Sequence, residues 1–255
     1  MGQIEALVLL FIFAVLRYLP VVILPSLSPM SWAPAIVRIT LLFSIALLSV
    51  MALPVIEYRT DWLSTEGLIF ASLSELLIGL TFSLAIMFPQ AAIGFAMRAA
   101  DMQAGFSAAT MFNPSGQHEP ESLLGSVVML AVTMLFFILD LHIQLFQIIS
   151  ESVKVFPLGD ISVHLNVDGF MLLLGSCFIL GLTVAAPIII GLFTVDVGVA
   201  YATRSMPQAN VYFLALPLKI VIALLLLSIA LNYLPMLIRN IFQNTFNQLP
   251  AVFGT

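Results

Sequence analysis

Charged side chains are scarce in this chain, and their scarcity excludes an ordinary soluble fold. Of the 255 residues, 62% are hydrophobic and only 8% are charged, against roughly 25% charged in a typical soluble domain. The 8 basic and 13 acidic residues cannot cover the surface of a core of this size. We therefore expect lipid, or a large protein partner, to surround most of the chain.

Basic runs and cysteine pairs are also missing. The net charge of −5 is spread thinly, and no run of Lys or Arg is available to neutralise a series of phosphates. Nucleic acid is therefore not an expected partner. The single cysteine, Cys177, lies in an apolar run and has no second cysteine for a disulfide or a metal cluster. We interpret it as a packing residue.

The sequence lacks the common enzyme signatures. It contains no Gly-rich phosphate loop followed by Lys, no His-Glu-x-x-His pair and no Ser flanked by glycines as in a nucleophile elbow. The three histidines, His118, His142 and His164, are too far apart in sequence to suggest a preset metal site. We expect no catalytic residue, cofactor or metal. An intramembrane hydrolase would require a paired nucleophile and base that the sequence does not show.

Long apolar runs are what the chain does contain. A helix that crosses a bilayer needs about 20 apolar residues, and a window of that length finds six candidates. They lie at about residues 4–24, 35–56, 68–88, 123–139, 170–193 and 211–231. The first is interpreted as an uncleaved helix rather than a signal peptide, because it lacks a basic start and contains Glu5 and Arg17. The sequence thus predicts an all-α fold of about six long hydrophobic helices.

Two connections between these runs are long, at residues 89–122 and 140–169. Structureless loops of that length are uncommon unless they are functional. The basic residues do not set an orientation, because equal numbers fall on the two sides of a six-span arrangement. Either the signal is weak in a short chain, or some of these helices are not simple spans.

Four ionisable side chains fall inside apolar runs: Arg17, Glu75, Asp196 and Lys219. Such groups are costly in lipid and usually face a bundle interior or a wet path. One interpretation is that Arg17 and Lys219 snorkel from near helix ends while Glu75 pairs with a neighbour. The other is a role in pairing subunits, and proton or solute transport is a third use.

Two prolines interrupt the later runs. Pro187 and Pro217 are each expected to kink a helix and to free a carbonyl that a neighbour must satisfy. Proline is also simply more frequent in membrane helices than in soluble ones, which is enough to explain at least one of them.

The segment 98–117 has an unusual composition. It combines methionine and phenylalanine with small residues and glycine, which predicts a pliable, apolar and non-helical surface. A loop of this kind can close a pore and still yield to a passing chain. Composition alone favours the other interpretation, a connecting loop that packs on its own helices.

Several motifs in the chain resemble one family. In chain order they are Met102-Gln103-Ala104-Gly105 with Asn113-Pro114, His142, Ser152 with Phe156-Pro157-Leu158-Gly159, Ala186-Pro187 with Asp196, and Arg204 with Pro207-Gln208-Ala209-Asn210-Val211 and Lys219. Over roughly residues 68–225 they resemble the FliR/SctT family of type III secretion export-gate proteins. The most specific part is the block from Arg204 to Lys219. Many members carry Gly or Asn before the histidine, where this chain has Asp140-Leu141-His142.

The resemblance implies a subunit of the export gate of a bacterial type III secretion system, more similar to the flagellar kind, in the inner membrane at the flagellar basal body. Its implied partners are several copies of FliP-type and FliQ-type subunits, an FlhB-type subunit, membrane lipid and unfolded export substrates. It also implies one subunit over residues 1–255, FliP-like over about 1–165 and a FliQ-like helical hairpin over about 166–255, with helices held largely above the membrane plane.

The resemblance further implies that residues 102–117 form a plug that closes the pore. The implied plug or constriction residues are Met102, Gln103, Gly105, Phe106, Met111, Phe112, Pro114 and Gly116. The charged residues implied to be buried or in subunit contacts are Glu75, Asp196, Arg204 and Lys219. The main alternative is a six-span small-molecule permease, which predicts an internal repeat that the chain does not clearly show.

Overall fold

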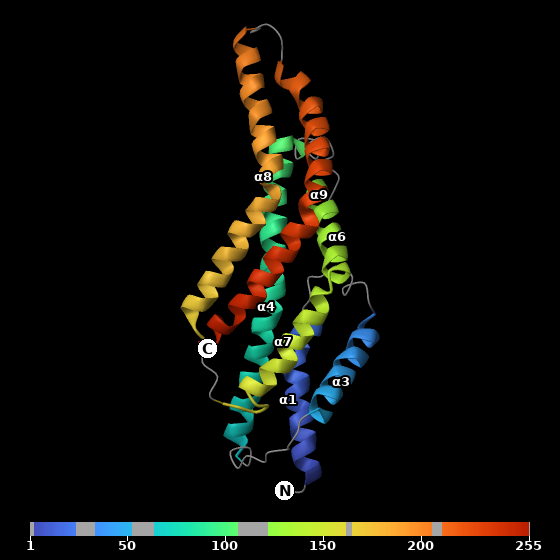
Figure 1. Cartoon of the computed structure of the whole chain (residues 1–255), viewed down its shortest axis with the longest axis vertical. Helices are drawn as coiled ribbons and strands as arrows, with labels where there is room; N and C mark the ends of the chain where they lie inside the picture. Colours follow the sequence, from blue (N-terminus) through green and yellow to red (C-terminus); the bar gives the residue numbers. More distant parts are fainter. Residues whose placement is uncertain are drawn as a thin grey trace. The chain divides into compact units, whose positions relative to one another are not determined.

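The computed structural model describes residues 3–23, 34–52, 64–106, 122–161, 165–205 and 211–254. Within these ranges the regular structure is helical throughout, and the predicted all-α class is confirmed (Figure 1). The helices are α1 (Gln3–Ile23), α3 (Ala35–Met51), α4 (Thr65–Ala104), α6 (Leu123–Ile138), α7 (Leu141–Val155), α8 (Val167–Ser205) and α9 (Val211–Val252).

Three helices are much longer than the apolar windows that predicted them. α4, α8 and α9 contain 40, 39 and 42 residues, which corresponds to a contour length of about 60 Å each at 1.5 Å per residue. The hydrocarbon core of a bilayer is only about 30 Å thick. The prediction that a connection begins at Pro89 was wrong, because α4 continues through this proline to Ala104. Membrane-type helices tolerate an internal proline when neighbours satisfy the freed carbonyl.

The second predicted connection, residues 140–169, was also wrong in part, because it contains α7. α7 buries Leu141, Leu145 and Ile149, one residue per helical turn, and leaves polar residues on its other side. Before it, Asp140 has a left-handed backbone with φ of 56°. Gly, Asn and Asp adopt this conformation most readily. Leu139 and Asp140 therefore form a two-residue break between α6 and α7, and Leu141 and His142 are the first residues of α7.

By length and composition, four helices of the described part of the chain are able to cross a membrane: α1, α4, α8 and α9. α6 and α7 together form a broken pair that would make a fifth span. α3 has 17 residues and is shorter than a usual span. Of the six predicted spans, α3 thus falls short, and α6 reaches this length only together with α7.

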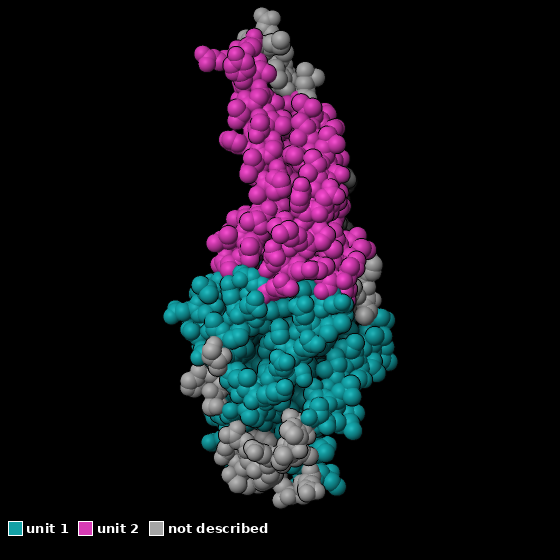
Figure 2. Space-filling view, viewed as in Figure 1, with its two compact units in different colours: residues 1–88, 140–174, 244–255 teal, residues 89–139, 175–243 magenta. Residues whose placement is uncertain are grey.

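The chain divides into two compact units that alternate along the sequence (Figure 2). Unit 1 comprises residues 1–88, 140–174 and 244–255, and unit 2 comprises residues 89–139 and 175–243.

In unit 1, α1 packs against α3 and against the first part of α4 (Figure 1). The rings of Phe11 and Phe43 lie 6.0 Å apart between α1 and α3. Gly79 of α4 touches α1 backbone to backbone, because a Cβ added there would lie 2.2 Å from the carbonyl oxygen of Arg17 and 2.9 Å from Cδ of Pro20. The absence of a side chain at Gly79 therefore sets how closely α1 and α4 approach.

In unit 2, α8 and α9 run side by side (Figure 1). A Cβ on Gly191 of α8 would lie 2.3 Å from the side chain of Leu226 on α9. A Cβ on Gly181 would lie 2.7 Å from Cβ of Ala92 on α4. Small residues thus allow close contact of α8 with two neighbours, as is typical of membrane helices, where hydrophobicity alone does not drive association.

We expect Gly79→Ala to lower the stability of the protein by about 1–3 kcal/mol, because the new methyl group overlaps backbone atoms of α1 that cannot rotate away. The thermal unfolding midpoint of the protein in detergent measures the effect. Gly175→Ala is the matched control, since no atom lies within 4 Å of its added Cβ. The control gains only helix propensity and should be neutral or slightly stabilising. Equal midpoints for the two variants would contradict the close contact.

Candidate functional site

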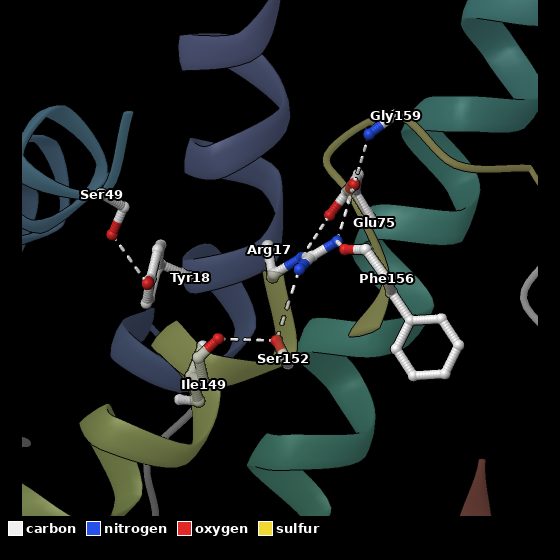
Figure 3. A network of polar contacts seen from close by, with 8 residues as sticks. All are labelled: Arg17, Tyr18, Ser49, Glu75, Ile149, Ser152, Phe156 and Gly159. Carbon is white, nitrogen blue, oxygen red and sulfur yellow. Dashed lines mark hydrogen bonds and ion pairs between the residues drawn. The ribbon is translucent and has the colours of Figure 1, made fainter. Parts of the chain in front are cut away.

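Charged side chains buried among apolar helices are the candidate site, because a charge held away from water needs a specific reason. In unit 1, Arg17 of α1 and Glu75 of α4 are both fully buried. Nε of Arg17 lies 2.5 Å from Oε2 of Glu75, and Nη2 lies 2.9 Å from Oε1 (Figure 3). The pair is bidentate, which is the strongest geometry for this combination of groups.

The other polar atoms of this pair also have partners. Nη1 of Arg17 donates to Oγ of Ser152 at 3.3 Å, and Nη2 donates to the carbonyl oxygen of Phe156 at 3.0 Å (Figure 3). The backbone N–H of Gly159 donates to Oε1 of Glu75 at 2.7 Å. We call these five residues the Arg17 cluster. It ties α1, α4, the end of α7 and the segment that follows α7 into one network.

The Arg17 cluster is built to hold helices together rather than to react. A fully buried guanidinium has lost its hydration, and only a complete set of acceptors compensates for that loss. Arg17 does not snorkel, as one interpretation of the sequence had it, because it lies in the middle of the packed unit. The signal that the sequence lacked was the identity of its acceptors, which lie 58, 135 and 139 positions away.

A second ion pair lies in unit 2. Nζ of Lys219 on α9 contacts Oδ1 of Asp196 on α8, and the two side chains are 14% and 35% exposed. Arg204, in the last turn of α8, is exposed. Within this chain, Asp196 and Lys219 thus pair with each other. Their partial exposure leaves both side chains accessible from outside the chain.

Asp101 was not singled out in the sequence, although it is a buried charge. This residue of α4 is 6% exposed, and its carboxylate accepts from Oγ of Ser122 and, at 3.0 Å, from the backbone N–H of Leu124. Ser122 is the N-cap of α6, and its Oγ also accepts from the N–H of Gly125 at 2.9 Å. A serine directly before an apolar run is a recognisable helix start, but nothing in the sequence indicates the aspartate that completes it.

The segment predicted to be a plug is described only at its beginning. Residues 98–104 belong to α4, so the expectation of a non-helical surface was wrong for them. Met102 is 64% exposed on the last turn of α4, and Gln103 and Phe106 are half-buried. Gly105 ends the helix with φ of 87°, where residues with a side chain are strained. Four further predicted plug residues lie outside the described residues: Met111, Phe112, Pro114 and Gly116.

The other residues named in the sequence analysis lie within helices or outside the described residues. Pro187 and Pro217 both lie inside continuous helices, α8 and α9, and the predicted kinks stay predictions. His142 lies in α7, whereas His118 and His164 fall outside the described residues. In the described ranges no group of three or more His, Cys, Asp or Glu is placed to hold a metal ion.

These observations define an apolar, membrane-type helical protein whose buried charges, Arg17, Glu75 and Asp101, have polar partners within the chain. The family model described as bacterial export proteins, family 1, matches residues 8–245. The chain belongs to this family.

Relatives with curated names agree with the family match. The chain is 29% identical to the flagellar biosynthetic protein FliR of Bacillus subtilis (strain 168), over 87% of this chain and 86% of that protein. It is 24% identical to FliR of Escherichia coli (strain K12), over 79% and 74%. It is 28% identical to the Yop proteins translocation protein T of Yersinia pestis, over 61% and 60%.

Family membership makes the chain a component of the type III protein-export apparatus. The predicted FliR/SctT family is confirmed by these matches. So is the predicted location, the bacterial inner membrane and its flagellar export apparatus, which also agrees with the apolar helices.

We expect Glu75→Ala to destabilise the protein by about 3–5 kcal/mol, because it leaves the Arg17 guanidinium buried without its counter-charge. The double variant Arg17→Met/Glu75→Leu should recover most of this loss, because it removes both charges and keeps the volume. Unfolding midpoints in detergent measure these changes, and the single variants Arg17→Met and Glu75→Leu complete a double-mutant cycle that gives the coupling. Glu66→Ala, at an exposed position of the same helix, is the control and should change little. Equal losses in the single and double variants would contradict the pairing.

Proposed function

We propose that this chain is a subunit of the type III export gate that lines the inner-membrane entry pore for unfolded export substrates, in a flagellar system. In this proposal it assembles with several copies of FliP-type and FliQ-type subunits and with an FlhB-type subunit. The role is structural and requires neither a cofactor nor a catalytic residue. The family match over residues 8–245 is the observation that carries the proposal.

The exposed apolar surface of α8 and α9 supports assembly with other subunits. Only 28% of the most apolar part of α8 and 17% of that of α9 is buried within the chain. On α8, Phe193, Val197 and Tyr201 are all exposed and succeed one another at helical spacing. Such a surface needs a cover of lipid or of other apolar helices.

The length of α8 and α9 supports the view that protein, and not only lipid, covers part of this apolar surface. Helices of about 60 Å are roughly twice as long as the hydrocarbon core of a bilayer. Whatever part of them lies in lipid, a comparable length lies outside it and still carries exposed apolar side chains. In an export gate, apolar helices of the partner subunits would cover this length.

We further propose that residues 1–165 correspond to a FliP-like part and residues 166–255 to a FliQ-like hairpin. The second part consists of two long helices, α8 and α9, in close contact at Gly191 and through the Lys219–Asp196 pair, which supports a hairpin. In the assembled gate, Asp196, Arg204 and Lys219 are proposed to contact neighbouring subunits.

The segment 102–117 is proposed to be the plug that closes the pore. Support comes from its start: Met102 is exposed on the last turn of α4, and Gly105 turns the chain out of the helix. A methionine and phenylalanine surface can repack around a passing chain, because neither side chain depends on one fixed partner. Glycine and proline would set the shape of the segment and let it move.

Affinity purification of the chain after co-expression with genes of the same operon, followed by native mass spectrometry, tests the assembly. We expect a discrete complex that contains two small apolar proteins in several copies, because the exposed faces of α8 and α9 require cover. Expression of the chain alone is the control and should give no such complex. A detergent-stable monomer or homodimer in both preparations would contradict the gate, and solute transport by the lone chain in liposomes would favour a permease.

Shortening the proposed plug tests its role. We expect deletion of residues 107–116 to make the assembled gate leak ions, because the apolar obstruction to conduction is lost. Conductance of the purified complex in planar bilayers is the measurement. Met111→Ser/Phe112→Ser is the matched variant, which keeps the length and removes the apolar side chains, and it should also leak. Unchanged conductance in both assembled variants would contradict the plug.

A further inference from the structure

α3 is attached to the rest of unit 1 along one narrow stripe. Its buried residues are Leu42, Ala46 and Val50, which recur once per helical turn and so lie on a single face. Beside this stripe, Oγ of Ser49 and Oη of Tyr18 on α1 share a hydrogen bond of 2.8 Å (Figure 3). All other residues of α3 are exposed or half-buried.

The exposed side of α3 is apolar and wide. It carries eight large apolar side chains between Ile36 and Met51. The most exposed of them, Ile36, Leu48 and Met51, have exposed fractions of 73%, 66% and 75%. At 3.6 residues per turn, the eight side chains fan out over about half of the circumference of the helix. We call these exposed residues the outer face of α3.

The hydroxyl groups on the outer face are satisfied inside the helix. Oγ1 of Thr40 donates to the carbonyl oxygen of Ile36, and Oγ of Ser44 donates to the carbonyl oxygen of Thr40 at 2.8 Å. Bonds to the preceding turn allow serine and threonine to dispense with an outside acceptor. The outer face therefore has no side-chain donor that requires water or a polar partner.

The charge and the length of α3 both suit an apolar layer. Its one charged residue, Arg38, is half-buried in the first turn, and a long basic side chain near a helix end can extend toward the interface of a bilayer. The 17 residues of α3 correspond to about 25 Å. The hydrocarbon core of a bilayer is about 30 Å thick, so the whole helix fits within it.

Acyl chains fit the outer face better than a helix of another subunit does. A packed helix contacts one stripe of its neighbour, whereas acyl chains adapt to the full width of an exposed face. Helix contacts within membranes are also enriched in small residues, as at Gly79 between α1 and α4 of the same unit. The outer face of α3 instead consists mainly of large aliphatic side chains.

α7 of the same unit has the opposite character. Gln147, Glu151 and Lys154 are exposed on it, and charged side chains are costly in hydrocarbon. The exposed surface of α7 thus favours water, while that of α3 favours lipid.

We propose that the outer face of α3 is the lipid contact of unit 1, where its side chains meet acyl chains of the inner membrane and not a partner subunit. The contact goes beyond the proposed gate, because it requires only that the protein lies in the membrane.

Nitroxide labels and two relaxation reagents test the lipid contact in the assembled complex. The complex is placed in nanodiscs of phosphatidylethanolamine and phosphatidylglycerol. Labels are attached to Ser44→Cys or Leu48→Cys in a Cys177→Ala background, which removes the single native cysteine. Oxygen concentrates in hydrocarbon, whereas a neutral nickel chelate stays in water. We expect both positions to be accessible to oxygen and shielded from the chelate.

Gln147→Cys, on the polar surface of α7, is the matched control. Its ratio of oxygen to chelate accessibility should be several-fold lower than the ratios at the two α3 positions. The Cys177→Ala complex without an added cysteine gives the background from partner subunits.

Each other result on α3 overturns the proposal. Low accessibility to both reagents at Ser44→Cys or Leu48→Cys means that protein covers the face, and high accessibility to the chelate means that water does. A ratio equal to that of Gln147→Cys is likewise a refutation. If native mass spectrometry finds no complex with other subunits, the proposed gate fails, and the same labels on the lone chain in nanodiscs still decide the lipid contact.

Discussion

The rule that a charge removed from water must find a complete set of partners organises this protein. Each of its two units has a buried charged contact between two helices in a mainly apolar interior, Arg17 with Glu75 in unit 1 and Asp101 with Ser122 and Leu124 in unit 2. Apolar helices can slide against one another at little cost, whereas a bidentate ion pair is satisfied in only one register. In unit 1 the close contact at Gly79 also helps to fix the register, because it brings α1 and α4 close enough for Arg17 and Glu75 to pair.

The same scarcity of charge that makes these contacts specific leaves the outside of the protein apolar. α8 and α9 bury a minor share of their apolar residues within the chain, and their length exceeds the thickness of a bilayer core. In the proposed gate, partner subunits would cover this apolar surface. The partly exposed Lys219–Asp196 pair lies on the two helices that carry the surface, a position suited to the proposed contacts between subunits.

Sequence reasoning succeeded where the signal was local and failed where it was not. Apolar runs predicted the helical class and the core of α1, α4, α6, α8 and α9. The extension of α4 past Pro89 was not predicted, because Arg98, Asp101 and Gln103 make its last turns polar and interrupt the apolar run. α7 was missed for the same reason, since its apolar residues recur once per turn instead of forming a run. Arg17 and Glu75 were identified individually, but a separation of 58 positions carries no local sign that they pair.

That separation also has a consequence for synthesis. At about 5–20 residues per second on the ribosome, the 58 positions between Arg17 and Glu75 correspond to about 3–12 s. During this interval the first helix has been made and its guanidinium has no counter-charge from α4. Newly made α1 cannot be fully buried in lipid, because Arg17 does not yet have its counter-charge. It must keep Arg17 in contact with water or with another acceptor until α4 emerges, so the order in which helices leave the ribosome sets when the first of them can be buried.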